Sequence, residues 1–346
     1  MPCLRMSTTR RVVHEAGRHF GDTGIDRLLR GAGQCLWLAS SLMACGDPES
    51  TPGEASPLVV EEAPSGVAPP LPTARPSGLP ALTAETPSAA PPPPVKRCPP
   101  EMVLVAQRLC VDRYEATLVV DKSGAQLSPY YPPERAKASY LMKLWQSKQG
   151  TGTEIEKTMA LPVLPEWQKE PFEPRAVSKK GVVPQAYASA KDATLACKNA
   201  GKRLCSKDEW RQACRGEQDR DFPYGDKYQD GKCNIVRELH PGVVLWADPS
   251  INHTDPRFNL VPGKKGPLLR VTGATPSCAS EWEGDAVYDM NGNVDEWIDD
   301  PEGTFLGGFY ARGKKDGCQS SVENHVFSYA DYSTGVRCCK DATAPR

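Results

Sequence analysis

The sequence predicts an α+β fold with little regular secondary structure, in which disulfides replace part of the missing helices and strands. Ten of the thirteen cysteines lie between Cys98 and Cys339. Two short helices with clear start and stop signals are expected between residues 189 and 216. After Gly216 the chain is rich in glycine, proline, asparagine and aspartate, with no long periodic run. The uneven spread of apolar residues over 346 positions favours one large folded domain.

The cysteines of the folding portion indicate an oxidising compartment. An even number, ten, allows five disulfides. The alternative is zinc binding, which is typical of paired C-x-x-C spacings, and the sequence has none. A formal net charge of −1 and the lack of a basic run argue against a nucleic-acid partner.

The N-terminus predicts export. Arg27 and Arg30 precede 35-CLWLASSLMAC-45, which resembles a bacterial signal peptide that closes in a lipobox. Residues 1–45 would then form the signal, and Cys45 would be lipidated and anchor the mature protein to a membrane. The run is too short to span a bilayer as a retained helix. An ordinary cleaved signal peptide is the alternative.

Residues 46–97 predict a disordered tether. They contain fourteen prolines, no aromatic residue and no cysteine, so they cannot bury enough apolar surface to offset the entropy of ordering. An extended proline-rich chain rises about 3.1 Å per residue. The tether would therefore hold the folded domain, expected over residues 98–342, well away from a membrane.

The folded domain begins with an expected β-hairpin over residues 103–120, where β-formers and polar groups alternate and Cys98 can close onto Cys110. Residues 121–183 interrupt the pattern and are expected to be an insertion. Within them, apolar residues at helical spacing predict a docked surface helix after Pro132-Pro133; a groove for a partner is the alternative. These residues are Ala136, Tyr140, Leu141, Leu144 and Trp145.

Capping boxes predict both short helices that follow. Ser189 with Asp192 starts the first, which ends at Gly201 after Cys197. The second begins at Ser206 with Glu209 three residues later and closes at Gly216. Each helix carries a cysteine that can form a disulfide with a cysteine of a distant strand.

Five motifs in order resemble the sulfatase-modifying-factor family, whose founding member is formylglycine-generating enzyme. The resemblance covers roughly residues 98–340 and implies a fold similar to a C-type lectin. It also implies a catalytic branch that oxidises a sulfatase cysteine to formylglycine. The motifs are 199-NAGKRLCSKDEWRQACRG-216, 222-FPYGD-226, 288-YDMNGNVDEW-297, Gly307-Gly308 and 335-GVRCC-339.

The resemblance implies two disulfides, Cys197–Cys338 and Cys214–Cys318. Spacing alone does not fix how the remaining cysteines pair. We expect the pairs Cys205–Cys339 and Cys233–Cys278.

The same resemblance implies a calcium site in the acidic loop 288–297. Hard oxygen ligands suit calcium, and a glycine lets the chain turn around the ion. The alternative is a self-capped Asx turn with Trp297 in the core. Asn234 matches a family position near a second calcium. The implied ligands are the side chains of Asp289 and Glu296 and the carbonyls of Gly292 and Val294.

Catalysis in the formylglycine branch requires two redox-active cysteines after the Gly-Gly motif, which bind copper and activate oxygen. Here residues 307–327 contain only Cys318, which the implied disulfide already uses. Asp295 also replaces a tryptophan that is usual beside the active site. We therefore expect no copper site and no catalytic residue, unless Cys318 is free.

A second catalytic branch of the family holds iron with histidines. The domain has His240, His253 and His325, none at H-x-x-x-H spacing, and a lone His325 in a polar loop predicts a surface residue. The leading hypothesis is a lipid-anchored extracytoplasmic domain that binds a protein or glycan of the cell envelope. The alternatives are a formylglycine-type oxidoreductase and a structural scaffold of a surface assembly.

Overall fold

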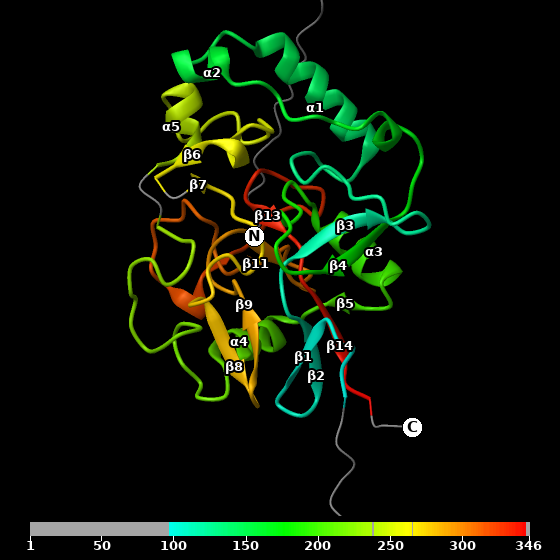
Figure 1. Ribbon diagram of the computed structural model, residues 1–346, viewed down its shortest axis with the longest axis vertical. Helices are drawn as coiled ribbons and strands as arrows, with labels where there is room; N and C mark the ends of the chain where they lie inside the picture. The colour runs from blue at the N-terminus through cyan, green and yellow to red at the C-terminus, as the bar shows by residue number, and fades with distance from the viewer. Residues whose placement is uncertain (1–96, 237–238, 265, 344–346) are drawn as a thin grey trace, which may run out of the picture. The chain divides into compact units, whose positions relative to one another are not determined.

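The computed structural model describes residues 97–236, 239–264 and 266–343 (Figure 1). The predicted signal peptide, Cys45 and the tether up to residue 96 lie outside these residues. The helices described are α1 (Arg135–Lys148), α2 (Glu154–Thr158), η1 (Glu166–Lys169), α3 (Ala190–Asn199), α4 (Lys207–Arg215), α5 (Pro241–Trp246), η2 (Phe258–Leu260) and η3 (Gly317–Gln319). In this part of the chain, no helix combines the length and apolar content needed to cross a membrane.

The strands are short, and the predicted α+β class with little regular structure is confirmed. The described strands are β1 (Met102–Val105), β2 (Leu109–Asp112), β3 (Ala116–Val120), β4 (Pro174–Ser178), β5 (Arg203–Leu204), β6 (Pro262–Gly263), β7 (Gly266–Pro267), β8 (Ala279–Trp282), β9 (Asp285–Tyr288), β10 (Asp295–Trp297), β11 (Phe305–Leu306), β12 (Ser321–Val322), β13 (Thr334–Gly335) and β14 (Cys338–Asp341).

Two sheets bring the end of the chain into the middle of the domain. Strand β14 pairs antiparallel with both β2 and β5, giving the order β1-β2-β14-β5. In the second sheet, of order β12-β11-β10-β13, strand β13 pairs parallel to β10. The two-residue connection between β13 and β14 therefore lies where the two sheets meet (Figure 1).

Local capping fixes helices α3 and α4 as predicted. Ser189 and Asp192 make both hydrogen bonds of a capping box at α3. Ser206 and Glu209 do the same at α4, which ends at Gly216 with a φ of +69°. These bonds satisfy backbone N–H groups that the first turn of a helix leaves without partners.

Five disulfides connect the described cysteines, and the pairs are those named above. Three of them link α3, the residue after β5 and α4 to the C-terminal part of the chain, and one closes the first hairpin. The pairs are Cys98–Cys110, Cys197–Cys338, Cys205–Cys339, Cys214–Cys318 and Cys233–Cys278.

Helix α1 forms inside residues 121–183, but the apolar stripe predicted for it is partly wrong. Leu141 and Trp145 are buried together with Ala138, whereas Ala136 is exposed and Tyr140 is 63% exposed. At about 100° per residue, positions 138, 141 and 145 share one face, while 136 and 140 lie opposite. The face that contacts the domain is therefore rotated from the one we predicted.

The same region packs firmly on the rest of the domain. The fully buried guanidinium of Arg257 donates to Glu156 of α2 at 2.7 Å and to Asp255 at 2.9 Å. Trp145 of α1 lies 5.6 Å, between ring centroids, from Trp246 of α5. Residues 121–183 thus contribute to the core of the described domain.

The Cys197–Cys338 disulfide should stabilise the fold more than the Cys98–Cys110 disulfide. The two close loops of 141 and 12 residues. The chain-entropy model gives about 5 and about 3 kcal/mol for loops of these lengths. We expect the Cys197→Ala/Cys338→Ala variant to lose more free energy of unfolding than Cys98→Ala/Cys110→Ala in chemical denaturation. If both variants lose the same free energy of unfolding, the length of the closed loop does not set the stabilisation.

Candidate functional site

The acidic loop between β9 and β10 turns tightly around one glycine. Asp289, Gly292 and Asn293 all have positive φ, at +62°, +97° and +64°. A Cβ on Gly292 would stand 2.4 Å from the carbonyl oxygen of Asn234, so no other residue fits without a shift of the backbone. The Asn293 N–H donates to that same carbonyl at 2.8 Å.

Glu296 and Arg337 form a buried ion pair at the centre of the domain. The Arg337 guanidinium donates to both carboxylate oxygens of Glu296 at 2.7–2.9 Å, and to the carbonyl oxygens of Asp112 and Tyr288. Trp210 of α4 adds a bond from Nε1 to Glu296 at 2.6 Å. Arg337 is fully buried, and Glu296 is 1% exposed. The pair and its partners join β2, α4, β9, β10 and the connection between β13 and β14.

Two further carboxylates lie in the same buried region. Glu115 accepts from the Asn293 side chain at 2.6 Å and from the Val294 N–H at 3.2 Å. Burial raises the pKa of Glu115 well above its ordinary value, and the nearby Asp289 and Glu296 charges raise it further. Burial likewise raises the pKa of Asp289 to about 6. Glu115 was not predicted as a site residue, because the connection between β2 and β3, where it lies, carries no motif that sets it apart.

These residues do not fit the implied calcium site. Glu296 already uses both oxygens on Arg337 and Trp210, and the guanidinium charge would repel a cation. Asp289 accepts from the Gly273 N–H at 2.7 Å. Across the described ranges, no cluster of three or more His, Cys, Asp or Glu side chains is arranged to hold a metal. Calcium binding stays a prediction, and this arrangement does not support it.

Asn234 has a structural position between two loops. Its side-chain amide donates to the carbonyl of Leu268 and to Oδ1 of Asn293, both at 2.9 Å. Trp297 is 1% exposed, and its Nε1 donates to the carbonyl of Ala188 at 2.8 Å. Trp297 therefore lies in the core, as the alternative interpretation of the acidic loop requires.

The segment after β11 corresponds to the place where the formylglycine branch of the family carries its redox cysteines. Gly307 and Gly308 have φ values of +96° and +77°, and a Cβ on Gly307 would meet Trp210 at 3.0 Å. Cys318 in η3 is fully buried and bonded to Cys214 of α4. The sulfur of Cys318 is therefore bound within a disulfide.

Beside this segment the structure forms a cavity of about 250 Å³, which we call the aromatic pocket. Its walls come from β11, the segment after it, the loop before β13 and the two ends of the α5 region. It is lined by His240, Pro249, His253, Phe305, Phe309, Arg312, Val322, His325, Tyr329, Asp331, Tyr332 and Ser333.

The aromatic pocket gathers the three histidines of the described domain. The Nε2 of His240 lies 2.8 Å from the Tyr332 hydroxyl, and the ring of His253 stands 5.7 Å from the Tyr332 ring. His325 contacts Tyr329 at 4.3 Å between ring centroids. His325 is partly exposed, and its ring also lies 5.0 Å from the Phe305 ring. Tyr332 lies 92 positions from His240 in the sequence, so no local sequence signal could have revealed this contact.

Arg312 and Asp295 form an ion pair at the edge of the aromatic pocket. Nη2 of Arg312 donates to Oδ2 of Asp295 at 2.5 Å, and the guanidinium lies 5.2 Å from the centre of the Phe309 ring. The other carboxylate oxygen, Oδ1, and the Arg312 Nε are both buried without a partner in the described structure. Burial raises the pKa of Asp295 to about 6, which Arg312 only partly offsets.

Loss of Arg337 should destabilise the protein strongly. Removal of one partner from a buried ion pair leaves an uncompensated charge and typically costs about 3–5 kcal/mol. We expect Arg337→Gln to lower the free energy of unfolding by that amount in chemical denaturation. Lys157→Gln, which removes the exposed pair with Glu154, is the matched control and should change it by less than about 0.5 kcal/mol. Similar losses in both variants would count against the central role of Arg337.

Asp295 should make stability depend on pH. A carboxyl whose pKa rises from 3.8 to about 6 on folding binds its proton more tightly in the folded state. The stability that Asp295 contributes to the fold is fully present below pH 3.8 and is lost as the pH rises through about 6. The stability of the native protein relative to Asp295→Asn should therefore rise by about 2–3 kcal/mol between neutral pH and about pH 4. Denaturation curves of both proteins across this range measure the difference, and a constant difference would contradict the prediction.

Comparisons with known proteins agree with the sequence motifs. A family model described as "Sulfatase-modifying factor enzyme 1-like domain" matches residues 145–342, starting within the expected insertion. The formylglycine-generating enzyme of Mus musculus is 31% identical over 118 residues, 34% of this chain and 27% of that protein.

Three solved structures are similar at low identity. A Major Tropism Determinant I1 variant has a TM-score of 0.37 and 12% identity over 73% of this chain and 55% of that chain. CarF has a TM-score of 0.33 and 14% identity, over 67% of this chain and 86% of CarF. PvdO from Pseudomonas aeruginosa has a TM-score of 0.32 and 14% identity, over 67% of this chain and 80% of PvdO. The chain thus spans less than two thirds of the mouse enzyme and of the tropism determinant. Since the family model matches more than half of the sequence, the chain belongs to the sulfatase-modifying-factor family.

Proposed function

We propose that this chain is an exported, lipid-anchored domain that recognises a protein or a glycan of the cell envelope, without oxidising cysteine. The observation that carries the proposal is the Cys214–Cys318 disulfide. Formylglycine formation by the family's known chemistry needs two free thiolates near each other after the Gly-Gly motif. Residues 307–327 contain one cysteine, and its sulfur is bound to Cys214.

The aromatic pocket supports recognition at the same place. Phe309, Tyr329 and the three histidines present rings that can stack on the apolar face of a sugar or on a peptide side chain. The Arg312 guanidinium, held by Asp295, adds a planar set of hydrogen-bond donors at the rim. Loops supply most of these residues, as is common for binding sites on a rigid scaffold.

The proposed location has two supports. Five disulfides indicate an oxidising compartment outside the cytoplasm. Lipidation at Cys45 and a proline-rich tether over residues 46–97 would hold the domain at a membrane yet away from its surface.

The absence of oxidase activity can be tested directly. Peptide mapping of the native exported chain should find Cys318 linked to Cys214 and closed to alkylation. Copper, oxygen and a peptide with the sulfatase motif should give no aldehyde product. Cys214→Ala serves as a control that frees Cys318 for labelling. Turnover by the native chain, or a labelled Cys318 in it, would overturn the non-catalytic proposal.

Binding should depend on the aromatic pocket. We expect the chain to bind isolated cell envelopes saturably, and Phe309→Ala and His253→Ala to weaken that binding at least about tenfold, a change of about 1.4 kcal/mol. Tyr140→Ala, a substitution of an exposed aromatic on α1, should bind as the native chain does. Unchanged binding in both pocket variants would reject this pocket as the recognition site.

A further inference from the structure

Backbone carbonyls fix the tautomers of two histidines in the aromatic pocket. The Nε2 of His253 lies 3.0 Å from the carbonyl oxygen of Pro249, and the Nδ1 of His325 lies 3.2 Å from the carbonyl oxygen of Glu323. Because a carbonyl oxygen only accepts hydrogen bonds, we assign the proton to each of these nitrogens. In the neutral rings the other nitrogen, Nδ1 of His253 and Nε2 of His325, is then an acceptor.

His240 uses both of its ring nitrogens and thereby frees a donor. The Gly242 N–H donates to Nδ1 of His240 at 3.1 Å, so the proton of the neutral ring lies on Nε2. Burial lowers the pKa of His240, which favours this neutral form. The Nε2–H therefore donates to the Tyr332 hydroxyl oxygen at 2.8 Å. The proton of that hydroxyl has no acceptor among the described residues and can be donated to a ligand.

The charges that line the aromatic pocket are already paired. Nη2 of Arg312 donates to the buried Asp295 at 2.5 Å. The Asp331 carboxylate accepts from the Tyr329 hydroxyl at 2.5 Å, and from the backbone and side chain of Ser333 at 2.8 and 2.7 Å. Each charged lining residue thus has a partner within the described structure, so the pocket favours a ligand without net charge.

The aromatic pocket also has the size of a site for one six-membered ring. Its volume of about 250 Å³ exceeds the roughly 150 Å³ of an apolar cavity that holds one benzene molecule, which leaves room for polar substituents. The half-buried Tyr329 is fixed by its bond to Asp331 and stacks on Phe305 with 6.3 Å between the ring centroids. Tyr329 therefore presents apolar surface that a ligand does not have to order.

We propose that the aromatic pocket binds one neutral hexopyranose unit of a glycan, an inference that rests on the proposed function and narrows it. The apolar face of the sugar would pack on the Phe309 or Tyr329 ring. Its hydroxyls would donate to the free ring nitrogen of His253 and accept from Tyr332 and from the Arg312 guanidinium. A sugar hydroxyl both donates and accepts, whereas an apolar protein side chain would leave these groups without partners.

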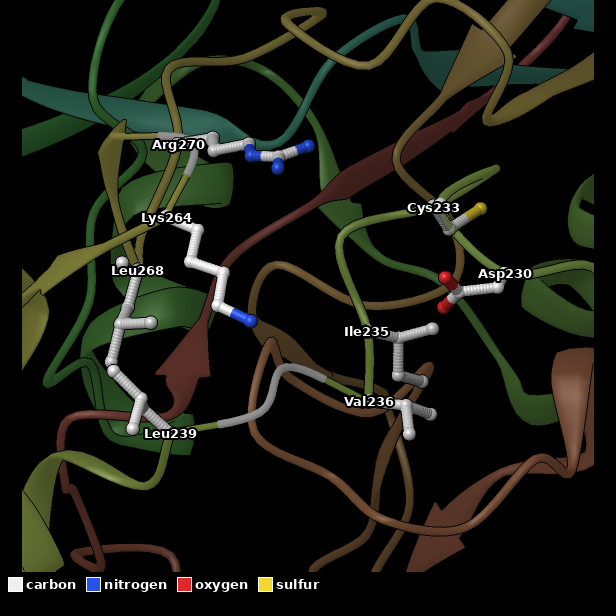
Figure 2. A pocket seen from close by; sticks show the side chains of 10 residues that line it. Asp230, Cys233, Ile235, Val236, Leu239, Lys264, Leu268 and Arg270 are labelled. Carbon is white, nitrogen blue, oxygen red and sulfur yellow. The ribbon is translucent and has the colours of Figure 1, made fainter.

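A second pocket provides a control site on the same domain. Asp230, Ile235, Leu268 and Arg270 are among the residues that line it, and its volume is about 120 Å³ (Figure 2). It shares no lining residue with the aromatic pocket. A substitution of Asp230 therefore alters a pocket of this chain and leaves every residue of the aromatic pocket in place.

Chemical treatment of isolated cell envelopes tests the class of ligand. Periodate cleaves the bond between carbons that carry neighbouring hydroxyls, so periodate-treated and quenched envelopes should bind the full chain at least about tenfold more weakly than untreated ones. Digestion of envelope proteins with a protease, removed before the chain is added, should leave binding unchanged. Loss of binding after proteolysis alone would overturn the sugar assignment and leave recognition by the pocket standing.

Titration with methyl β-D-glucopyranoside, methyl β-D-galactopyranoside and methyl α-D-mannopyranoside tests the single ring. We expect saturable one-to-one binding of at least one of them to the full chain in ligand-observed NMR. Cyclohexylmethanol, which has a ring of the same size and one hydroxyl, should bind at least about tenfold more weakly because it lacks most of the hydrogen bonds. If none of the three glycosides binds, the proposal fails, whether or not the chain binds envelopes.

Conservative variants locate the site. Tyr332→Phe and His253→Phe each keep a ring and remove hydrogen-bonding groups, and each should weaken glycoside binding about three- to tenfold. Tyr140→Phe, which removes an exposed hydroxyl on α1, and Asp230→Asn should leave it unchanged. Melting temperatures without ligand report whether a variant folds, and His253→Phe at its partly exposed position decides if Tyr332→Phe does not.

The sugar assignment and the proposed function fail in different ways. Native glycoside binding by His253→Phe would overturn the assignment of the sugar to this pocket. Glycoside binding that needs the pocket, together with envelope binding that persists in Phe309→Ala and His253→Ala, would support the sugar site and reject the pocket as the place of envelope recognition.

Discussion

The buried Arg337–Glu296 ion pair is the interaction on which the rest of this domain depends. A guanidinium without exposure to water must satisfy its donors inside the protein, and Arg337 does so on Glu296 and on two backbone carbonyls. Those partners belong to the first hairpin, to the end of β9 and to β10, so the charge fixes how three segments approach. The neighbouring Cys338 and Cys339 form disulfides with Cys197 of α3 and with Cys205, the residue after β5, and these disulfides hold Arg337 at this position.

The same pair balances part of the negative charge of the acidic loop. Glu296 is neutralised by Arg337, and Glu115 and Asp289 have raised pKa values because of their burial. Asn293 then connects the loop outward, since its side chain bonds Glu115, Asn234 and the backbone of Arg270. Asn293 therefore fixes the acidic loop to three other segments of the chain.

The segment after the Gly-Gly motif, residues 307–327, contains a single cysteine. A disulfide occupies Cys318, while Arg312 and Asp295 form an ion pair beside it. Arg312 lies against Phe309, and the three histidines add further rings to the aromatic pocket. These side chains are the basis of the recognition function that we propose.

The sequence by itself determined the features that depend on neighbours in the chain or on covalent chemistry. The caps at Ser189 and Ser206, the turn at Gly292, and the fold class followed from local rules, and family motifs implied two of the disulfides.

Only the tertiary structure decided which groups surround each buried charge. Arg337 forms its ion pair with Glu296, which lies 41 positions away in the sequence. His240, His253 and His325 come from separate loops and line the same pocket. It also set which face of α1 is buried, because helical spacing alone does not say where the domain lies. Long-range contacts of this kind arise from packing in three dimensions, and no local pattern of residues encodes them.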